Sequence, residues 1–183
     1  NIFLNTTDLL VSTFTNNFQI NPALAVLNNS NVVMVWASYN QAGSNSMQDV
    51  YARIFSPSGQ PVTGEFLVNQ FTSYNQRTPA VVALKGGGFA VTWVSEQERM
   101  QTAGSPVDPA VTNTLGAMVT PSVDIYARLY DGNGLAQGNE FLVNADFNPC
   151  SNPSLAAGSD GGFMVAWDAR DMASVNTNSL DIY

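Results

Sequence analysis

The sequence predicts an all-β protein built from three copies of one four-stranded antiparallel unit. A Pro-to-Trp segment recurs with the same 14-residue spacing at Pro22–Trp36, Pro79–Trp93 and Pro153–Trp167. No stretch shows the sustained 3.6-residue periodicity of an amphipathic helix. The 183 residues are 45% hydrophobic but only 11% charged. The chain therefore has enough apolar side chains for a core, and its polarity comes from Asn, Ser, Thr and Gln.

The first two strands of each unit lie within this Pro-to-Trp segment. In the first copy, residues 23–27 alternate apolar with small residues, and residues 32–36 form an apolar run that ends in tryptophan. Alternation is typical of a strand with one exposed face, and a continuous run is typical of a strand buried on both faces. One position of the repeat is occupied by tryptophan in all three units, at Trp36, Trp93 and Trp167. We therefore expect these side chains to lie in the core of each unit; an aromatic platform that stacks on a sugar is the alternative.

The third strand begins at an Asp-Val/Ile-Tyr motif, at Asp49, Asp124 and Asp181. In the first copy it ends at a Ser-Pro-Ser-Gly turn, and the second copy carries Asp-Gly-Asn-Gly there, a strong hairpin signal. The fourth strand, Glu65–Asn69 or Glu140–Asn144, starts 16 positions after the Asp in both copies. Three tyrosines share one place in the third strand and complete the expected core signature: Tyr51, Tyr126 and Tyr183.

The repeats divide the chain into four segments. We expect a strand segment at residues 1–21, a first unit at 22–78, a second at 79–152 and an incomplete third at 153–183. The second unit is longer because residues 96–122 are inserted between its second and third strands. The insert is rich in Pro, Thr and Ala, as is typical of a surface loop. The insert could be a tolerated insertion without a role. Because it also contains apolar residues, contact with a partner is the alternative.

The N-terminus carries the strand that the third unit lacks. Residues 8–22 align without gaps on residues 65–79, although residues 2–7 also resemble residues 66–69. A meander of about 55 residues has the size of a propeller blade. The sequence therefore predicts a β-propeller-like array of about three four-stranded antiparallel blades, one of them split between the two termini.

Three explanations of the split blade remain open. The ends meet within one molecule, the N-terminal strand completes the last blade of a neighbouring subunit, or the chain was cut from a longer array. Strand addition to an open edge, repeated head to tail, produces a filament. In that case the assembly strand holds its partner through four apolar side chains: Leu9, Val11, Phe14 and Phe18.

The repeated motifs resemble those of a known class of protein. The pattern is Pro…Gly-Gly-Phe-x-Val-x-Trp…Asp-Ile-Tyr-Ala-Arg-Leu-Tyr-Asp-x-x-Gly…Glu-Phe-Leu-Val-Asn, and it covers the chain outside the insert. It resembles the propeller-like repeats of very large secreted bacterial surface proteins, some of which are adhesins. The resemblance implies an extracellular location, no catalysis by the repeats, and a role as a spacer or adhesive surface.

Composition argues against several functions. The net charge is −8 and Lys85 is the only lysine, so the surface lacks the cationic footprint needed for nucleic acid or anionic membranes. The longest apolar run, residues 32–37, is far shorter than the ~20 residues of a membrane helix, so no membrane insertion is expected. There is no histidine, the commonest general base and metal ligand.

The charged residues do not form a pattern typical of an enzyme. Asp-x-Tyr-x-Arg sets occur at 49–53 and again at 124–128, whereas a sialidase-like site converges once. We therefore expect an ion pair within each blade and tyrosine packing. A glycosidase would need an unrepeated pair of carboxylates, which the sequence does not offer. We expect no enzymatic activity, no catalytic residue and no cofactor.

Other candidate sites are weak. The turns at 131–134 and 160–162 carry one Asp each, while Ca²⁺ needs six to eight oxygen ligands, so they are interpreted as turns, with a weak Ca²⁺ site as the alternative. Sequons make Asn5 and Asn28 candidates for glycosylation. Cys150 is expected to be a lone thiol, with an intermolecular disulfide as the alternative.

These observations favour a secreted, non-enzymatic structural protein. We expect a subunit or segment of a surface filament or adhesin whose partners are copies of itself, joined head to tail by strand complementation. Two alternatives remain: a lectin-like carbohydrate-binding propeller with glycans as partners, and a fragment of a larger secreted repeat protein.

Overall fold

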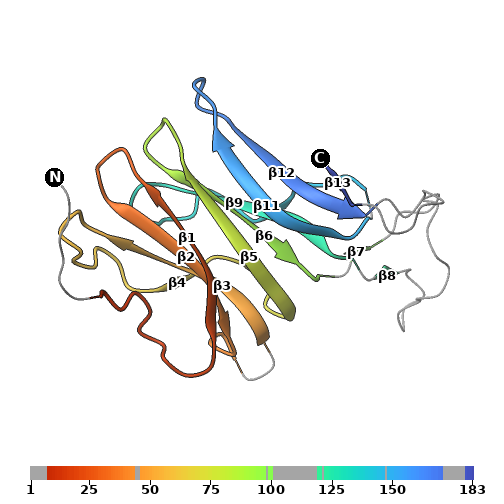
Figure 1. The fold of residues 1–183 in the computed structure, drawn as a ribbon, viewed down its shortest axis with the longest axis horizontal. Helices are drawn as coiled ribbons and strands as arrows, with labels where there is room; N and C mark the ends of the chain where they lie inside the picture. Colours follow the sequence, from red (N-terminus) through yellow and green to blue (C-terminus); the bar gives the residue numbers. More distant parts are fainter. Residues whose placement is uncertain are drawn as a thin grey trace.

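The protein is all-β, with one mixed sheet and further antiparallel sheets. A computed structural model describes residues 8–43, 46–97, 99–100, 119–120, 122–146, 148–170 and 180–183 (Figure 1). The strands are β1 (Gln19–Val26), β2 (Val32–Tyr39), β3 (Ser46–Phe55), β4 (Phe66–Leu67), β5 (Tyr74–Ala83), β6 (Phe89–Ser95), β7 (Arg99–Met100), β8 (Val119–Thr120), β9 (Asp124–Tyr130), β10 (Phe141–Leu142), β11 (Cys150–Ala157), β12 (Phe163–Arg170) and β13 (Leu180–Ile182).

The strands form three repeated meanders. Unit 1 is β1 to β4 and unit 2 is β5, β6, β9 and β10, with antiparallel neighbours throughout. Unit 3 contains β11, β12 and β13. The prediction of an all-β fold is confirmed. The described residues form a row of sheets and no closed ring, so the predicted propeller stays unconfirmed.

Local geometry repeats with the sequence. The first hairpin of each unit turns through a residue of positive φ at one aligned place, which is Ser30 (68°), Gly87 (99°) or Gly161 (97°). Each first strand also has a register shift at its proline. The residue before that proline has a positive φ in all three units, at Asn21, Thr78 and Asn152. Such β-bulges bend a strand and increase its local twist.

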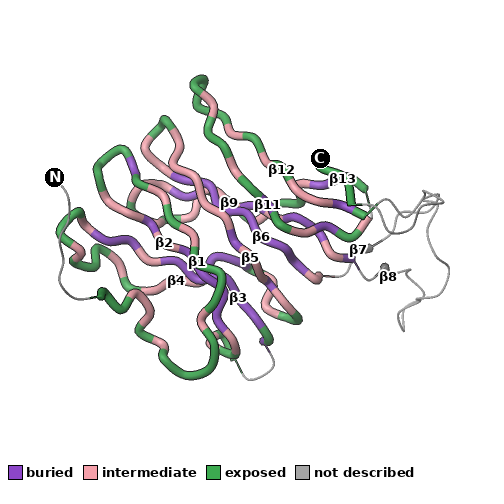
Figure 2. The backbone as a smooth tube through the Cα atoms, viewed as in Figure 1, coloured by how far each residue is buried: buried purple, intermediate pink, exposed green. Residues whose placement is uncertain are grey.

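Neighbouring units pack against each other through the faces of their sheets. The start of β3 pairs in parallel with the start of β5, which joins units 1 and 2. One core cluster lies between units 1 and 2 and includes Val33, Val50, Val91 and Trp93. A second cluster lies between units 2 and 3. Figure 2 shows the buried residues concentrated in β2, β3, β6 and β9, while β12 and β13 are more exposed.

The insert and the N-terminal segment differ from the structure expected for them. The insert at 96–122 continues as β7 and β8, which pair with each other, so its described base is a two-stranded ladder and not a plain loop. Its other residues lie largely outside the described part. In the single chain, residues 8–18 of the expected N-terminal strand segment form no strand, and β1 begins at Gln19.

Candidate assembly site at the amino-terminal segment

Residues 8–18, here called the N-segment, lie against unit 1 at one end of the row of sheets (Figure 1). Arg53 on β3 donates from Nη1 to the carbonyl of Val11 over 2.8 Å. The backbone N–H of Thr13 donates to Oε1 of Glu65. The N-segment is thus held by a cation and a carboxylate from the third and fourth strands of the unit that follows it.

The same two contacts join unit 1 to unit 2. Arg128 donates from Nη1 to the carbonyl of Val68 over 2.9 Å, and the N–H of Gln70 donates to Oε2 of Glu140 over 2.6 Å. Val68 and Gln70 stand 57 positions after the N-segment residues that make the matching contacts. The N-segment therefore occupies, on unit 1, the place that the fourth strand of unit 1 occupies on unit 2. These contacts support the gap-free alignment of residues 8–22.

The N-segment lacks the strand partner that its counterpart has. In unit 1, β4 pairs with β3, and the N–H of Val68 donates to the carbonyl of Val50 over 2.8 Å. In the described part of the chain, the N–H of Val11 has no acceptor. The neighbouring Leu9 and Leu10 are 45% and 69% exposed. A strand forms only when a ladder partner is present, which explains why the segment is not one here.

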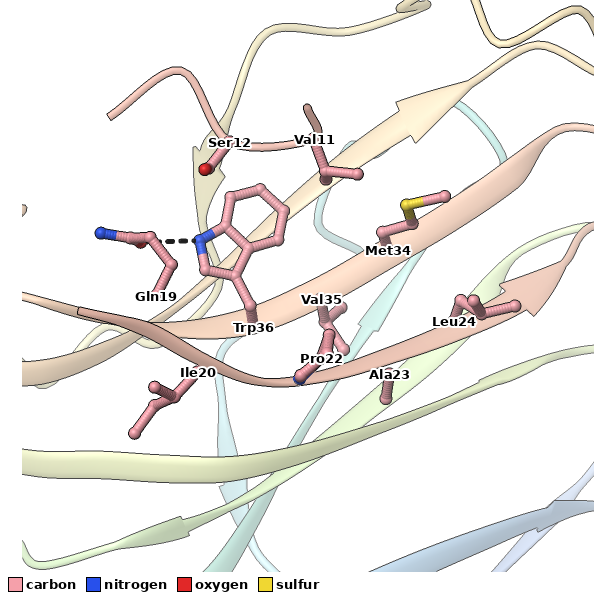
Figure 3. A pocket seen from close by; sticks show the side chains of 10 residues that line it. All are labelled: Val11, Ser12, Gln19, Ile20, Pro22, Ala23, Leu24, Met34, Val35 and Trp36. Atoms are coloured by element: carbon pink, nitrogen blue, oxygen red, sulfur yellow. Dashed lines mark hydrogen bonds between the residues drawn. The ribbon is translucent and has the colours of Figure 1, made fainter. Parts of the chain in front are cut away.

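An apolar groove of about 360 Å³ lies between the N-segment and the sheet of unit 1 (Figure 3). Val11, Met34 and Trp36 form part of its lining, together with residues of β1. The indole N–H of Trp36 donates to Oε1 of Gln19 over 3.2 Å, so the polar edge of that ring is satisfied within the chain. The groove therefore presents a mainly apolar surface, with few polar groups, to any side chain or ligand that binds in it.

Unit 3 lies at the other end of the row (Figure 1), and one of its faces carries exposed apolar side chains beside Asp168. Met164 on β12 is 74% exposed, and Leu180 and Ile182 on β13 are 61% and 75% exposed. Ile182 pairs with Asp168 of β12, so its side chain stands on the same face as Met164. Among the described residues β13 is an edge strand.

The four predicted assembly residues lie in different surroundings. Val11 and Phe14 are half-buried. Leu9 lines a second groove of about 500 Å³ beside Val26 and Phe55. Phe18 is 70% exposed and makes an edge contact with the ring of Tyr39, with 5.9 Å between centroids. Leu9 and Val11 thus lie beside grooves, whereas Phe18 packs at the start of β1.

The repeated aromatic residues differ in their surroundings: Trp93, Tyr126 and Trp167 belong to the clusters between units, whereas Trp36 lines the groove beside the N-segment. Trp36 is 4% exposed and Trp93 is fully buried, while Trp167 is half-buried. Trp167 stacks on Tyr183 with 6.2 Å between centroids and 15° between planes. The related tyrosines have graded exposure: Tyr51 is 8% exposed, Tyr126 is half-buried and Tyr183 is 46% exposed. Trp93 is enclosed on all sides, whereas the small exposed part of Trp36 borders the groove.

The ion pair expected between Asp49 and Arg53 is not formed. The two residues are four positions apart on one strand, a separation of roughly 13 Å. Arg53 instead donates to the carbonyls of Val11 and Thr63, and its guanidinium lies over the ring of Phe55 at 5.1 Å. Face alternation alone could not reveal this, because the acceptors come from other segments.

A buried Asp–Asn pair was missed by sequence reasoning. Asn69 accepts from the N–H of Val50 over 2.7 Å and donates to Oδ1 of Asp49 over 2.8 Å. Ser46 donates to the other carboxylate oxygen. Burial raises the pKa of Asp49, and these two side-chain hydrogen bonds partly oppose that rise. Unit 2 repeats the pair with Asn144. The recurring 20-residue Asp-to-Asn spacing was the available signal.

The remaining candidates have ordinary local roles. Asp131 Oδ1 accepts from the N–H groups of its own turn, and Asp160 Oδ1 does likewise. No cluster of three metal-ligating side chains occurs within the described residues. Asn28 donates from Nδ2 to the carbonyls of Leu84 and Lys85, whereas Asn5 lies outside the described part. Glycosylation of both asparagines stays a prediction.

The single cysteine lies inside the protein. Cys150 is 3% exposed and its thiol donates to the carbonyl of Asn148 over 3.1 Å. It belongs to the core cluster between units 2 and 3. This burial separates the sulfur from other molecules, so an intermolecular disulfide would require unit 3 to open.

Comparisons with known proteins add no family. No family model matches the chain, and no curated protein matches it. Among the described residues, no helix is long and apolar enough to span a membrane.

Proposed function

We propose that this chain is a non-enzymatic extracellular structural protein, a subunit of a surface filament or adhesin that assembles head to tail by strand complementation. One observation carries the proposal. The N-segment is hydrogen-bonded to an arginine and a glutamate of unit 1. The equivalent arginine and glutamate of unit 2 bind the end of the fourth strand of unit 1 in the same way. The N-segment is thus positioned as the last strand of a preceding unit.

The complementary site is the edge of β13. In units 1 and 2 the N–H of the valine that follows β4 or β10 donates to the carbonyl of the second residue of the Asp-Val/Ile-Tyr motif, as Val68 to Val50 and Val143 to Ile125, each over 2.8 Å. The aligned pair is Val11 and Ile182. In the proposed assembly, the N–H of Val11 in one copy donates to the carbonyl of Ile182 in the next copy. Backbone ladders of this kind supply the affinity in strand addition.

Extended unpaired edges promote association between chains. The N-segment and β13 lie at opposite ends of the row of sheets (Figure 1). Pairing within one molecule would require these ends to meet, whereas pairing between molecules uses both sites where they stand. The arrangement therefore favours a contact between copies. Such a contact is heterologous because it joins two different surfaces of the chain. Each added copy leaves one surface of each kind free, so repetition of the contact lengthens the assembly.

The proposal is tested by Val11→Pro in the full chain. Proline removes the N–H that the ladder needs, while no hydrogen bond within the described chain is lost. We expect the variant to keep its β-sheet circular dichroism and to lose assembly in light scattering and electron microscopy. The matched control, Val11→Ala, keeps the N–H and should still assemble. Unchanged assembly of Val11→Pro would contradict strand complementation.

A further inference from the structure

Each unit presents one face to the unit that follows it, and the contact has a fixed pattern. Between units 1 and 2, Val33 of β2 and Val50 of β3 lie in one core cluster with Val91 and Trp93 of β6. All four side chains are fully buried. Apolar residues of the second and third strands thus pack on the second strand of the next unit.

The contact between units 2 and 3 repeats this pattern. Ile125, which aligns with Val50, is fully buried in a cluster with Val165 and Trp167 packed against it. Val165 and Trp167 align with Val91 and Trp93. The positions of Val50, Val91 and Trp93 thus recur in both observed interfaces, whereas the position of Val33 is Ala90 in unit 2 and lies outside the second cluster.

In unit 3 the presenting positions are uncovered. Met164 aligns with Val33, and Ile182 aligns with Val50. Their side chains are 74% and 75% exposed, whereas both counterparts in unit 1 are fully buried. Exposed apolar patches on one face mark interaction sites when they are contiguous. Met164 and Ile182 share one face of the third sheet, where Ile182 lies opposite Asp168, four residues along β12 from Met164.

Unit 1 has the receiving positions. Met34 aligns with Val91, and Trp36 aligns with Trp93. Both line the groove of about 360 Å³ that the N-segment borders through Val11 (Figure 3). In unit 2 the corresponding positions, Val91 and Trp93, are covered by residues of unit 1.

We infer that Met164 and Ile182 of one copy fill the groove lined by Met34 and Trp36 in a second copy of this chain. This contact is continuous with the proposed ladder between Val11 and β13, since Val11 borders the groove. The inference rests on the proposed head-to-tail function and adds the side chains that would determine the choice of partner. The backbone ladder would provide association, and the apolar side chains would select another copy of this repeat as partner.

The test uses lysine substitutions in the full chain. Met164→Lys and Ile182→Lys place a charge on the presenting face, and the matched control is Leu135→Lys. Leu135 is 67% exposed in the turn between β9 and β10, away from both faces. Sedimentation equilibrium should show association weakened at least about tenfold by either substitution on the face. The control should stay close to the unmodified chain.

A charge exchange tests direct contact. Met34→Glu alone should weaken association as the lysines do. The double variant Met34→Glu/Met164→Lys sets opposite charges at each junction, and we expect it to associate more strongly than either single variant. Circular dichroism and urea unfolding of every variant establish that the units stay folded.

The outcomes separate this inference from the proposed function. If Val11→Pro abolishes assembly but Met164→Lys and Ile182→Lys assemble normally, strand complementation stands and the groove contact is wrong. Absence of charge rescue in the double variant also contradicts direct contact. If the unmodified chain is monomeric at every concentration, the proposed function fails and this inference with it.

Discussion

Replacement of Asn69 by alanine should be among the most destabilising substitutions in unit 1. Asn69 is 1% exposed and its amide makes three hydrogen bonds. It accepts from Val50, and it donates to the carboxylate of Asp49 and to the carbonyl of Phe71 over 2.8 and 2.9 Å. Alanine removes all three bonds and leaves their partners enclosed.

The magnitude follows from the kind of bond that is lost. A bond between neutral groups contributes about 0.5–1.5 kcal/mol and one to a charged group about 1.5–3 kcal/mol. Two neutral bonds and one charged bond give a loss of about 2.5–6 kcal/mol in the free energy of unfolding. Asn144→Ala should cost a similar amount, because Asn144 bonds to Ile125, Asp124 and Asp146 in the same way.

Urea unfolding followed by tryptophan fluorescence at neutral pH measures this loss. The control is Asn16→Ala, at an exposed position of the N-segment, which should change the unfolding free energy by about 0.5 kcal/mol or less. If Asn69→Ala lowered the unfolding free energy by under about 1 kcal/mol, the argument that this amide anchors the third strand to the fourth would be refuted.

Two further predictions concern buried titratable groups. Burial raises the pKa of Asp49 above 3.8, so its stabilising contribution is present at acid pH and lost as the pH rises through the folded-state pKa. Asp49→Asn should therefore be more stable than the unmodified chain at neutral pH, with the difference shrinking below about pH 4 in urea unfolding; a difference that grew on acidification would contradict this. Burial raises the pKa values of Tyr51 and Tyr130 to about 12. In ultraviolet titration we expect both to ionise after the exposed tyrosines, with loss of stability as the pH rises from about 10 to 12; titration of all six tyrosines near pH 10 would contradict it.

Much of the local structure could be predicted from repetition. The Pro-to-Trp spacing located the first two strands of every unit, although β1, β5 and β11 begin before the prolines and bulge there. Turn chemistry located the hairpins, because glycine and serine recur where φ is positive. Hydrophobic patterning and turn residues act over a few neighbours, so their consequences can be predicted from the chain alone.

Long-range partners could not be predicted in this way. The sequence placed Asp49 and Arg53 on one strand face and suggested an ion pair, but their partners are Asn69 and the carbonyl of Val11. Likewise the alignment identified the N-segment as a fourth strand, and only the tertiary structure showed it mounted on the next unit without a ladder.

The sequence by itself therefore determined the repeat, its strand order and the equivalence of residues 8–22 with 65–79. The tertiary structure decided which faces meet, because packing depends on surfaces brought together from distant segments. It covers Val33 and Val50 and leaves Met164 and Ile182 exposed at equivalent positions. The difference arises because a sheet face is buried only where another unit lies against it.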